Sequence, residues 1–290
     1  MTASTSRVTE ELTPAWVGGP MSELAEGPRW HAGQLTWVDI TAGALHTHDP
    51  SKGTFATQYV PDTLGMVAPR ENGGWLLAIG AQIVLRDPDG HDRVLATLGD
   101  ADMRCNDGVC GPDGALYVGT VHRTNPEHQG IFVRVEGDGT VEPILEGLGI
   151  SNGIGFSPDG SLAYYVDSLD RRVDVLDLRD GTRDPLIAIN EEGCLPDGLA
   201  VDAEGAIWVA IYAGGQVRRH LPDGRLDRVV HLPTSQVTAV TFGGADLSDL
   251  YITTAREHLG PQERVAQPLA GGVFRIAGAG RGLPVQAFAG

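Results

Sequence analysis

The stretch LPDGLAVDAEGAIWVAIYAGGQVRRHLPDGRLDRVVHL (residues 195–232) holds short apolar or alternating runs that are separated by tight turns. Its runs are rich in β-branched and aromatic residues, which is typical of β-strands. The intervening Asp-, Pro- and Gly-containing segments favour chain reversal, because Pro presets φ and Gly accepts positive φ. The stretch therefore predicts one unit of about four short antiparallel strands.

Similar units recur along the whole chain. Equivalent strand positions are separated by 41, 39, 48, 43 and 43 residues. These positions are Trp37, Ala78, Tyr117, Tyr165, Trp208 and Tyr251. A period of this length with four strands per unit predicts an all-β fold, a six-bladed β-propeller with four strands per blade. Two β-sandwiches of three units each are the alternative, but no Pro- or Ser-rich linker divides the chain.

We expect residues 1–290 to form a single six-bladed propeller domain, with residues 1–13 as a flexible N-terminal tail. The segment PAWVGGP (residues 14–20) is a candidate outer strand for the last blade, which would close the ring. His46 and His48 alternate on one predicted strand, and we interpret them as surface residues.

The composition favours a globular protein with a small-molecule or cation ligand. The chain has 290 residues, 41% of them hydrophobic, and a formal net charge of −17. This acidic balance argues against a nucleic-acid partner. The N-terminal residues do not resemble a signal peptide, no run is long enough to span a membrane, and three cysteines cannot all pair. We therefore expect a cytoplasmic protein that acts without nucleic acid or membrane.

Pro-Asp-Gly occurs five times, and one copy differs from the others in its position within the repeat. Four copies fall between the first and second or the third and fourth strands of a unit, at what we call the far mouth of the channel. Their acids, Asp89, Asp113, Asp159 and Asp223, are expected to be ordinary turn residues. Asp197 instead comes where an innermost strand begins, at the opposite end, the near mouth.

The repeat phase places further oxygen-bearing residues beside Asp197. Counting back eight residues from the first-turn glycine of a unit leads to Asp197, Asn152 and Asn106, and in the first unit to Ala25, next to Glu26. Each of these side chains taken singly is explained as well by a turn or a cap. Their shared phase predicts oxygens at one height around one axis, a donor set that suits Ca²⁺, Mg²⁺ or Mn²⁺.

Such a site suits a metal-assisted hydrolase. A cation held by Glu26, Asn152 and Asp197 would polarise a carbonyl and activate water, and an adjacent carboxylate would take the proton. Arg104 and Asn106, on the loop that leads into the third unit, would bind hydroxyls or a developing oxyanion. Two long connections, residues 121–130 and 255–271, are candidate lids, and the first supplies His122 as a further substrate contact.

The motifs AEGPRW (25–30), RCNDG (104–108), ISNGIGFSPDG (150–160), GCLPDGLAVDAEGAIWVA (193–210) and YITTAR (251–256) resemble the SMP-30/gluconolactonase/luciferin-regenerating-enzyme family, which includes regucalcin. The resemblance implies a six-bladed propeller that binds one divalent cation. It also implies that the protein hydrolyses sugar lactones. It implies Glu26, Asn152 and Asp197 as metal ligands, with Asp197 also the general base. It implies that Arg104 and Asn106 bind the substrate. Calcium is the expected ion, with magnesium, manganese or zinc as alternatives.

Two departures from the family pattern lie on the substrate side. Gly119-Thr120 is followed by Val-His-Arg-Thr, where sugar lactonases often have Met and acidic residues, and Cys105 replaces a common aromatic residue. We therefore expect a gluconolactonase-like hydrolase of a small lactone. The alternatives are a hydrolase or biosynthetic enzyme for a non-sugar lactone or ester, and a non-enzymatic calcium-binding propeller.

Overall fold

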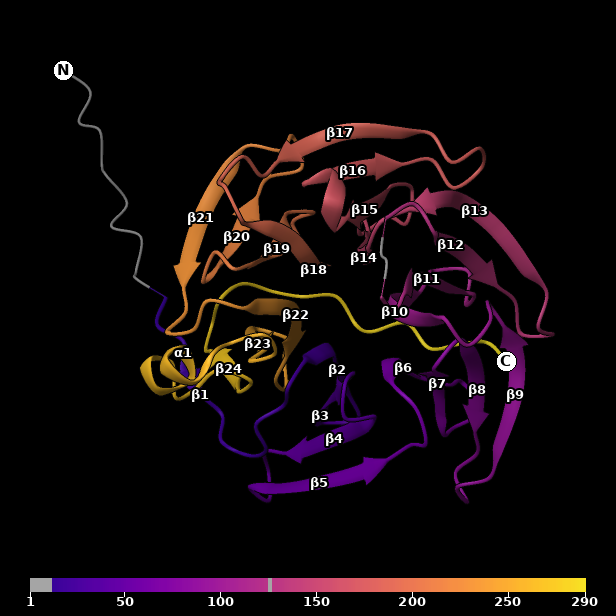
Figure 1. Cartoon of the computed structure of the whole chain (residues 1–290), viewed down its shortest axis with the longest axis horizontal. Coiled ribbons are helices and arrows are strands. Elements are labelled where there is room, and N and C mark those ends of the chain that lie inside the picture. The colour runs from indigo at the N-terminus through magenta and orange to yellow at the C-terminus, as the bar shows by residue number, and fades with distance from the viewer. Residues whose placement is uncertain (1–11, 125–126) are drawn as a thin grey trace.

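Six four-stranded antiparallel sheets surround a central axis in the computed structural model, which describes residues 12–124 and 127–290 (Figure 1). The predicted six-bladed propeller is confirmed. Each of the six positions that defined the repeat lies on the second strand of its blade, so the spacing in the sequence corresponds to one blade per unit.

The strands are numbered in chain order, and the innermost strand of each blade is named first below. Blade one contains β2 (Ala25–His31), β3 (Gln34–Asp39), β4 (Ala44–Asp49) and β5 (Thr54–Tyr59). Blade two contains β6 (Leu64–Pro69), β7 (Trp75–Ile79), β8 (Gln82–Arg86) and β9 (Asp92–Thr97). Blade three contains β10 (Met103–Cys110), β11 (Leu116–His122), β12 (Gly130–Val135) and β13 (Val141–Leu148).

The second half of the ring repeats this order. Blade four contains β14 (Ser151–Phe156), β15 (Ala163–Asp167), β16 (Arg172–Leu176) and β17 (Arg183–Ala188). Blade five contains β18 (Leu195–Val201), β19 (Ile207–Tyr212), β20 (Gln216–His220) and β21 (Leu226–His231). Blade six contains β22 (Val237–Gly243), β23 (Asp249–Thr254), β24 (Val273–Ile276) and β1 (Ala15–Trp16). Two short helices, the 3₁₀ helix η1 (Ser168–Asp170) and α1 (Pro261–Ala266), lie in connections.

The ring is closed by pairing between the two ends of the chain. Strand β1 pairs antiparallel with β24, with Ala15 opposite Arg275 and Trp16 opposite Phe274. This confirms the predicted outer strand. Of the predicted N-terminal tail, residues 1–11 lie outside the described residues, whereas Leu12 packs against the hydrophobic cluster between blades five and six.

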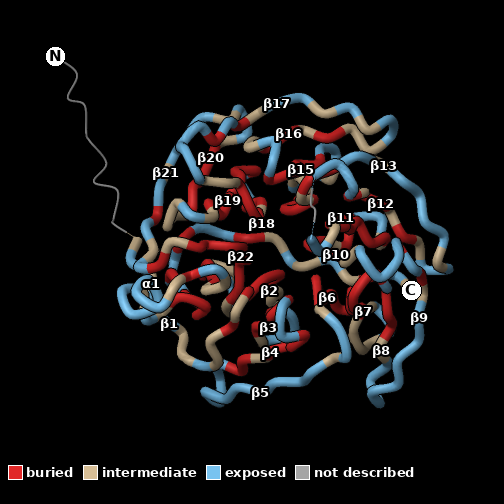
Figure 2. The backbone as a smooth tube through the Cα atoms, in the orientation of Figure 1, coloured by how far each residue is buried: buried red, intermediate tan, exposed pale blue. Residues whose placement is uncertain are grey.

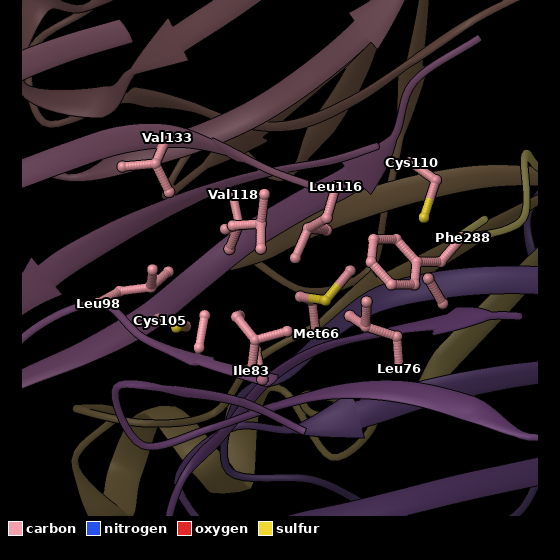
Figure 3. Close-up of a cluster of buried hydrophobic side chains, with 14 of the residues drawn as sticks. Met66, Leu76, Ile83, Leu98, Cys105, Cys110, Leu116, Val118, Val133 and Phe288 are labelled. Atoms are coloured by element: carbon pink, nitrogen blue, oxygen red, sulfur yellow. The ribbon is translucent and has the colours of Figure 1, made fainter. Parts of the chain in front are cut away.

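A C-terminal strap, residues 277–290, crosses the far mouth and was not predicted from the sequence (Figure 1). It is held by backbone hydrogen bonds to three blades: Ala203 N donates to Arg281 O (2.8 Å), Phe288 N to Pro69 O (2.8 Å) and Ala289 N to Gly114 O (2.9 Å). The Phe288 ring is fully buried in the cluster between blades two and three (Figure 3). The strap therefore braces the end of the channel opposite the predicted site.

Burial falls from the axis to the rim of the propeller. The inner strands are mostly buried, whereas β5, on the outer edge of blade one, is exposed along its whole length (Figure 2). The apolar clusters lie mainly between adjacent blades, as Met66 and Leu76 of blade two do against Leu116 and Val118 of blade three (Figure 3). Burial of such side chains contributes about 1.5–3 kcal/mol each, so packing between blades holds the inner strands in place.

The surface interpretation of His46 and His48 is wrong, because the side chains of the outer strand cover both rings. His46 Nδ1 is 2.9 Å from Thr57 Oγ1, and the His48 ring stacks on Phe55 at 4.3 Å. Cys105, Cys110 and Cys194 are free thiols. Within the described part of the chain, no helix is both long and apolar enough to cross a membrane.

Candidate metal and substrate site

All six innermost strands break their register with the second strand near the near mouth. The breaks lie between Glu26 and Arg29, Leu64 and Val67, Cys105 and Gly108, Ser151 and Ile154, Pro196 and Leu199, and Val237 and Ala239. A β-bulge leaves residues unpaired and turns their side chains away from the regular alternation. In blades three, four and five the unpaired residues include Asn106, Asn152 and Asp197, which are the three residues that the count from the first-turn glycine identified.

The bulges touch one another around the ring. Asn106 Nδ2 donates to Ser151 O (2.9 Å), joining blade three to blade four. Thr238 Oγ1 donates to Ala25 O (2.6 Å), joining blade six to blade one. A Cβ at Gly153 would lie only 2.6 Å from Asp197 O, so this close approach requires glycine. The blades thus fix the height and separation of the bulged residues.

The three predicted metal ligands are almost fully buried. Asn152 and Asp197 are unpaired bulge residues, and Glu26 directly precedes the bulge of β2. Glu26, Asn152 and Asp197 are 5%, 5% and 6% exposed. Asn152 Nδ2 donates to Ser168 Oγ (3.1 Å), which fixes the amide orientation. Asn152 Oδ1 and Asp197 Oδ1 are buried without a hydrogen-bond partner. Such unsatisfied buried oxygens are rare, and each calls for a ligand, an ion or water.

The carboxylates at this mouth repel one another. Burial raises the pKa of Glu26 well above its usual value, and the charges of Asp197 and Asp107 raise it further. Burial and the charge of Asp107 likewise raise the pKa of Asp197, while the neighbouring Asn152 amide acts in the opposite direction. A divalent cation would relieve this repulsion, and two carboxylates with an amide oxygen are donors that such an ion prefers.

The donor set fits a cation only if the amide takes part. Within residues 12–124 and 127–290, no group of three or more His, Cys, Asp or Glu side chains could hold a metal ion. A cation held by Glu26 and Asp197 would therefore need the Asn152 amide oxygen as a third donor. Three protein ligands would leave further positions for water and substrate.

Arg104 and Asn106 lie side by side, but on strand β10 itself and not on the loop that the sequence suggested. Arg104 Nη1 donates to Asn106 Oδ1 (2.7 Å), and Asn106 Nδ2 donates to Ser151 O. Both ends of the Asn106 amide are thus engaged, unlike the oxygen of Asn152. This difference makes Asn106 a weaker candidate than Asn152 for a metal ligand.

His122 is the last residue of β11, where it pairs with Met103, one residue before Arg104. Its side chain is half-buried, and its Nδ1 accepts a hydrogen bond from Thr124 N (3.2 Å). The adjacent Arg123 is engaged by Asp62, with a 2.9 Å ion pair. Residues 125 and 126 of this candidate lid lie outside the described part of the chain.

The second candidate lid, residues 255–271, is a braced wall of the near mouth. Ala255 forms a β-bridge with Leu24, and Glu23 accepts from both Arg256 Nε (2.9 Å) and Arg264 Nη2 (2.8 Å). Ser235 N donates to Gln267 Oε1 (2.6 Å) at the C-terminal end of α1. These bonds fix the connection to blades one and six at several points.

Two residues at this mouth were missed by sequence reasoning. Glu257 lies on the braced wall and is half-buried; burial raises its pKa, and its charge acts on Arg104 and Asp197. Tyr212 ends β19, and the charges of Glu257 and Asp197 raise the pKa of its phenol beyond the effect of burial. Only the position of Glu257 directly after the YITTAR motif pointed to it, since no repeat-phase rule covers this connection.

A buried ion pair joins blade one to blade three beside the candidate site. Arg29 Nη2 lies 3.6 Å from Asp107 Oδ1 and donates to Gly108 O (2.6 Å). Arg29 and Asp107 line a cavity of about 380 Å³ together with apolar and polar residues of the inner strands and with Leu283 and Val285 of the C-terminal strap.

The fold and site together define a six-bladed propeller whose near mouth presents buried hard-oxygen donors beside a guanidinium and an amide. Residues 24–256 match the family described as the SMP-30/gluconolactonase/LRE-like region. The chain belongs to this family, as the motifs in the sequence indicated.

Relatives match this protein over most of their length. The 6-deoxy-6-sulfogluconolactonase of Pseudomonas putida is 37% identical, with 87% of this chain and 90% of the relative covered. Human regucalcin is 33% identical, with 91% and 94% covered. Among solved structures, a calcium-binding regucalcin from Agrobacterium tumefaciens superposes with a TM-score of 0.88 at 30% identity, covering 95% of this chain and 98% of the other.

Proposed function

We propose that this protein is a divalent-metal-dependent lactonase that opens a small lactone, most simply a sugar aldonolactone, to the hydroxy acid. The observation that carries the proposal is the pair of unpartnered buried oxygens, Asn152 Oδ1 and Asp197 Oδ1, beside the Glu26 carboxylate. Membership of the family and similarity to a protein named as a sulfogluconolactonase support the reaction class.

Glu26, Asn152 and Asp197 would hold the cation. Calcium is the first candidate, because all three donors are hard oxygens and the structurally similar regucalcin is described as calcium-binding. Magnesium, manganese and zinc are the alternatives to be tested. When bound, the ion would polarise the lactone carbonyl and lower the pKa of water at the site.

The protein side chains would supply binding and proton transfer. The Arg104 guanidinium, oriented by the Asn106 amide, would donate hydrogen bonds to the lactone oxygens. Asp197 would act as the general base that accepts a proton from the attacking water. His122 would contact the substrate from the end of β11.

A lactone panel assayed with the chelated protein, before and after reloading with each metal, tests the proposal. Hydrolysis of aldonolactones that is lost on chelation and restored by an added divalent ion is the expected result. Turnover confined to non-sugar esters would favour the alternative enzyme. Metal binding without any hydrolysis would favour the non-enzymatic propeller and overturn the proposal.

We further propose that the protein works in the cytoplasm on a small molecule, with neither nucleic acid nor membrane as partner. The free cysteines suit a reducing compartment, and burial raises the pKa of the Cys105 and Cys110 thiols to about 12, which keeps them unreactive. The net charge of −17 disfavours binding to polyanions. Fractionation of cells that express the tagged full chain would test the location.

A further inference from the structure

We propose that strand β5 is a self-association edge, through which two copies of this protein pair antiparallel about a two-fold axis to form a weak dimer. β5 (Thr54–Tyr59) is the outer strand of blade one, three strands away from the innermost strand β2 that carries Glu26. The contact therefore lies on the rim of the propeller, away from the candidate site. The inference is independent of the proposed lactonase function.

The outer edge of β5 presents a row of free backbone groups. β5 ends its sheet, and among the described residues it pairs with β4 alone. Val60 N, directly after β5, donates to Gly43 O (2.8 Å) on the β4 side. Hydrogen-bonded pairs alternate along an antiparallel ladder, so the even-numbered residues of β5 bond to β4. The N–H and C=O groups of the odd-numbered residues, Phe55, Thr57 and Tyr59, therefore point outward.

The outer strands of the other five blades are protected against such pairing. Proteins blunt exposed strand edges with charges, prolines, bulges or very short strands. β1 has two residues, while β9, β13, β17 and β21 each carry charged residues and a register break against their neighbour. β13 and β17 also contain Pro143 and Pro185. β5, with the sequence TFATQY, has neither charge nor proline and pairs with β4 through six residues without a break.

The outward residues of β5 form a palindrome in residue type, which favours a second copy of the chain as the partner. Phe55 and Tyr59 are aromatic residues two positions before and after Thr57. In an antiparallel register centred on Thr57, each Phe55 lies opposite Tyr59 of the other copy, and the two Thr57 residues meet at the axis. Aromatic pairs and Thr–Thr pairs are favourable across strands. All of these residues point their backbone groups outward, so each facing pair can exchange its N–H and C=O hydrogen bonds.

The side chains that would meet are exposed, and two of them are held in place. Tyr59 is 73% exposed and Phe55 is 36% exposed, and aromatic residues are enriched at protein interfaces. The Phe55 ring stacks on His48 at 4.3 Å, and Thr57 Oγ1 lies 2.9 Å from His46 Nδ1. Pairing would therefore order few additional groups, which lowers the entropic cost of association.

The charge around β5 permits the contact, although the charge of the whole chain opposes it. The flanking cations are compensated, since Lys52 pairs with Asp49 and Arg86 with Asp92, each at 2.7 Å. Two chains of net charge −17 repel one another, and salt screens this repulsion. One pair of six-residue strands is also a small contact beside the roughly 1,200–2,000 Å² of stable interfaces. We therefore expect a micromolar dimer that strengthens with salt.

Sedimentation velocity of the full-length protein, from about 1 to 200 μM, tests the proposal. The expected result is a monomer–dimer equilibrium whose dissociation constant falls when sodium chloride is raised from about 50 to 500 mM. Thr57→Lys places two ammonium groups opposite each other at the axis and should raise the dissociation constant at least about tenfold. Thr97→Lys makes the same change at an exposed position on β9 and should leave the equilibrium unchanged.

A second variant protects the test against a folding defect, because Thr57 also contacts His46. Tyr59→Lys alters a side chain that is 73% exposed and should weaken the dimer without lowering the melting temperature measured at low protein concentration. A wild type that stays monomeric throughout would overturn the proposal. A dimer that is insensitive to both substitutions, or one that dissociates as salt is added, would also overturn it.

Hydrogen–deuterium exchange identifies what covers the edge. The amides of Phe55, Thr57 and Tyr59 should exchange fast in dilute protein and become protected as the concentration rises, whereas those of β9 should not change. Protection that is already complete in the dilute monomer would mean that the same chain covers β5, and it would overturn the proposal.

Discussion

The two mouths of the channel use the same tripeptide in opposite ways. At the far mouth, Asp113 accepts from Ala115 N (3.2 Å) and Asp159 accepts from Ser161 N (3.1 Å), so each acid closes its own hairpin turn. At the near mouth, Asp197 lies in a bulge of β18, and its Oδ1 is buried without a partner. The position of Pro-Asp-Gly within the blade, and not the tripeptide itself, decides whether its aspartate stabilises a turn or stays available for a ligand.

The two ends of the channel therefore differ in role: the far mouth stabilises the fold, and the near mouth keeps groups available for a ligand. The far mouth is braced by hairpins and by the C-terminal strap, and the turn carboxylates of Asp113 and Asp159 accept hydrogen bonds there. The near mouth holds like charges and unpaired oxygens, and each unsatisfied buried polar group costs about 1–3 kcal/mol. Rigid packing between blades maintains that costly arrangement, which is common at sites that bind ligands.

The largest expected effect is loss of activity in Asp197→Ala. The change removes a proposed ligand and the proposed base together, so kcat should fall by about a thousandfold or more. Steady-state kinetics on the preferred lactone would measure it, with circular dichroism to confirm the fold. Asp159→Ala, the same change at the far mouth, is the matched control, and equal losses in the two variants would contradict the contrast between the mouths.

Phe288→Ala should lower stability and leave activity nearly unchanged, which is the opposite of the effect expected for Asp197→Ala. Removal of a fully buried ring that joins the strap to blades two and three should cost about 3–5 kcal/mol of the free energy of unfolding. Urea denaturation would measure this loss. We expect kcat at 25 °C to stay within about twofold of the wild type, because the ring lies at the far mouth. A large change in kcat would show that the two mouths are coupled.

The stabilisation by calcium should increase with pH. The folded-state pKa values of Glu26 and Asp197 are raised, so in the metal-free protein their ionisation opposes folding as the pH rises from the ordinary carboxyl value of about 4 toward those raised values. Calcium binds the ionised forms and competes with protons. Melting temperatures with calcium and with chelator, compared from pH 5 to 8, should diverge as the pH increases.

Glu26→Gln removes one of the repelling charges and provides the control for this pH effect. The metal-free variant should lose less stability on raising the pH than the wild type does, and calcium should stabilise it less. A calcium effect that is independent of pH, or equal in the two proteins, would mean that these carboxylates do not hold the ion.

The smallest expected effect is that of Asp159→Asn at the far mouth. Hydrogen bonds from Ser157 and Ser161 lower the pKa of Asp159 to about 2, so its contribution is present at neutral pH and lost only when the pH falls toward 2. The variant should melt about 1–3 °C lower at pH 7, with unchanged kinetics. Differential scanning calorimetry would detect this shift, and a change in KM would contradict the separation of the mouths.

The features that follow from local patterns could be predicted from the sequence. The repeat located all six second strands, and its phase identified Asp197, Asn152 and Asn106, because each blade positions its inner strand in the same way. The count for the first unit reached Ala25, and Glu26 was chosen as the oxygen-bearing residue next to it, a choice that the family resemblance also implied. The bulge in β2, which a count from a turn does not detect, lies between Glu26 and Arg29.

The features that depend on contacts between blades could not be predicted in this way. Burial of His46 and His48 follows from packing against the outer strand of blade one, and the strap is held by backbone bonds to distant turns. Glu257 reaches the near mouth because Glu23 and Gln236, far away in sequence, hold its backbone. Such long-range contacts leave no periodic signal in the residues that make them.

Anomalous diffraction from crystals grown with manganese tests the central claim most directly, since manganese is one of the candidate ions and scatters anomalously. We predict a single strong peak at the near mouth, bonded to oxygens of Glu26, Asn152 and Asp197, and absent from crystals of the Asp197→Ala variant. No peak within bonding distance of all three side chains, or an ion held elsewhere in the channel, would contradict the account.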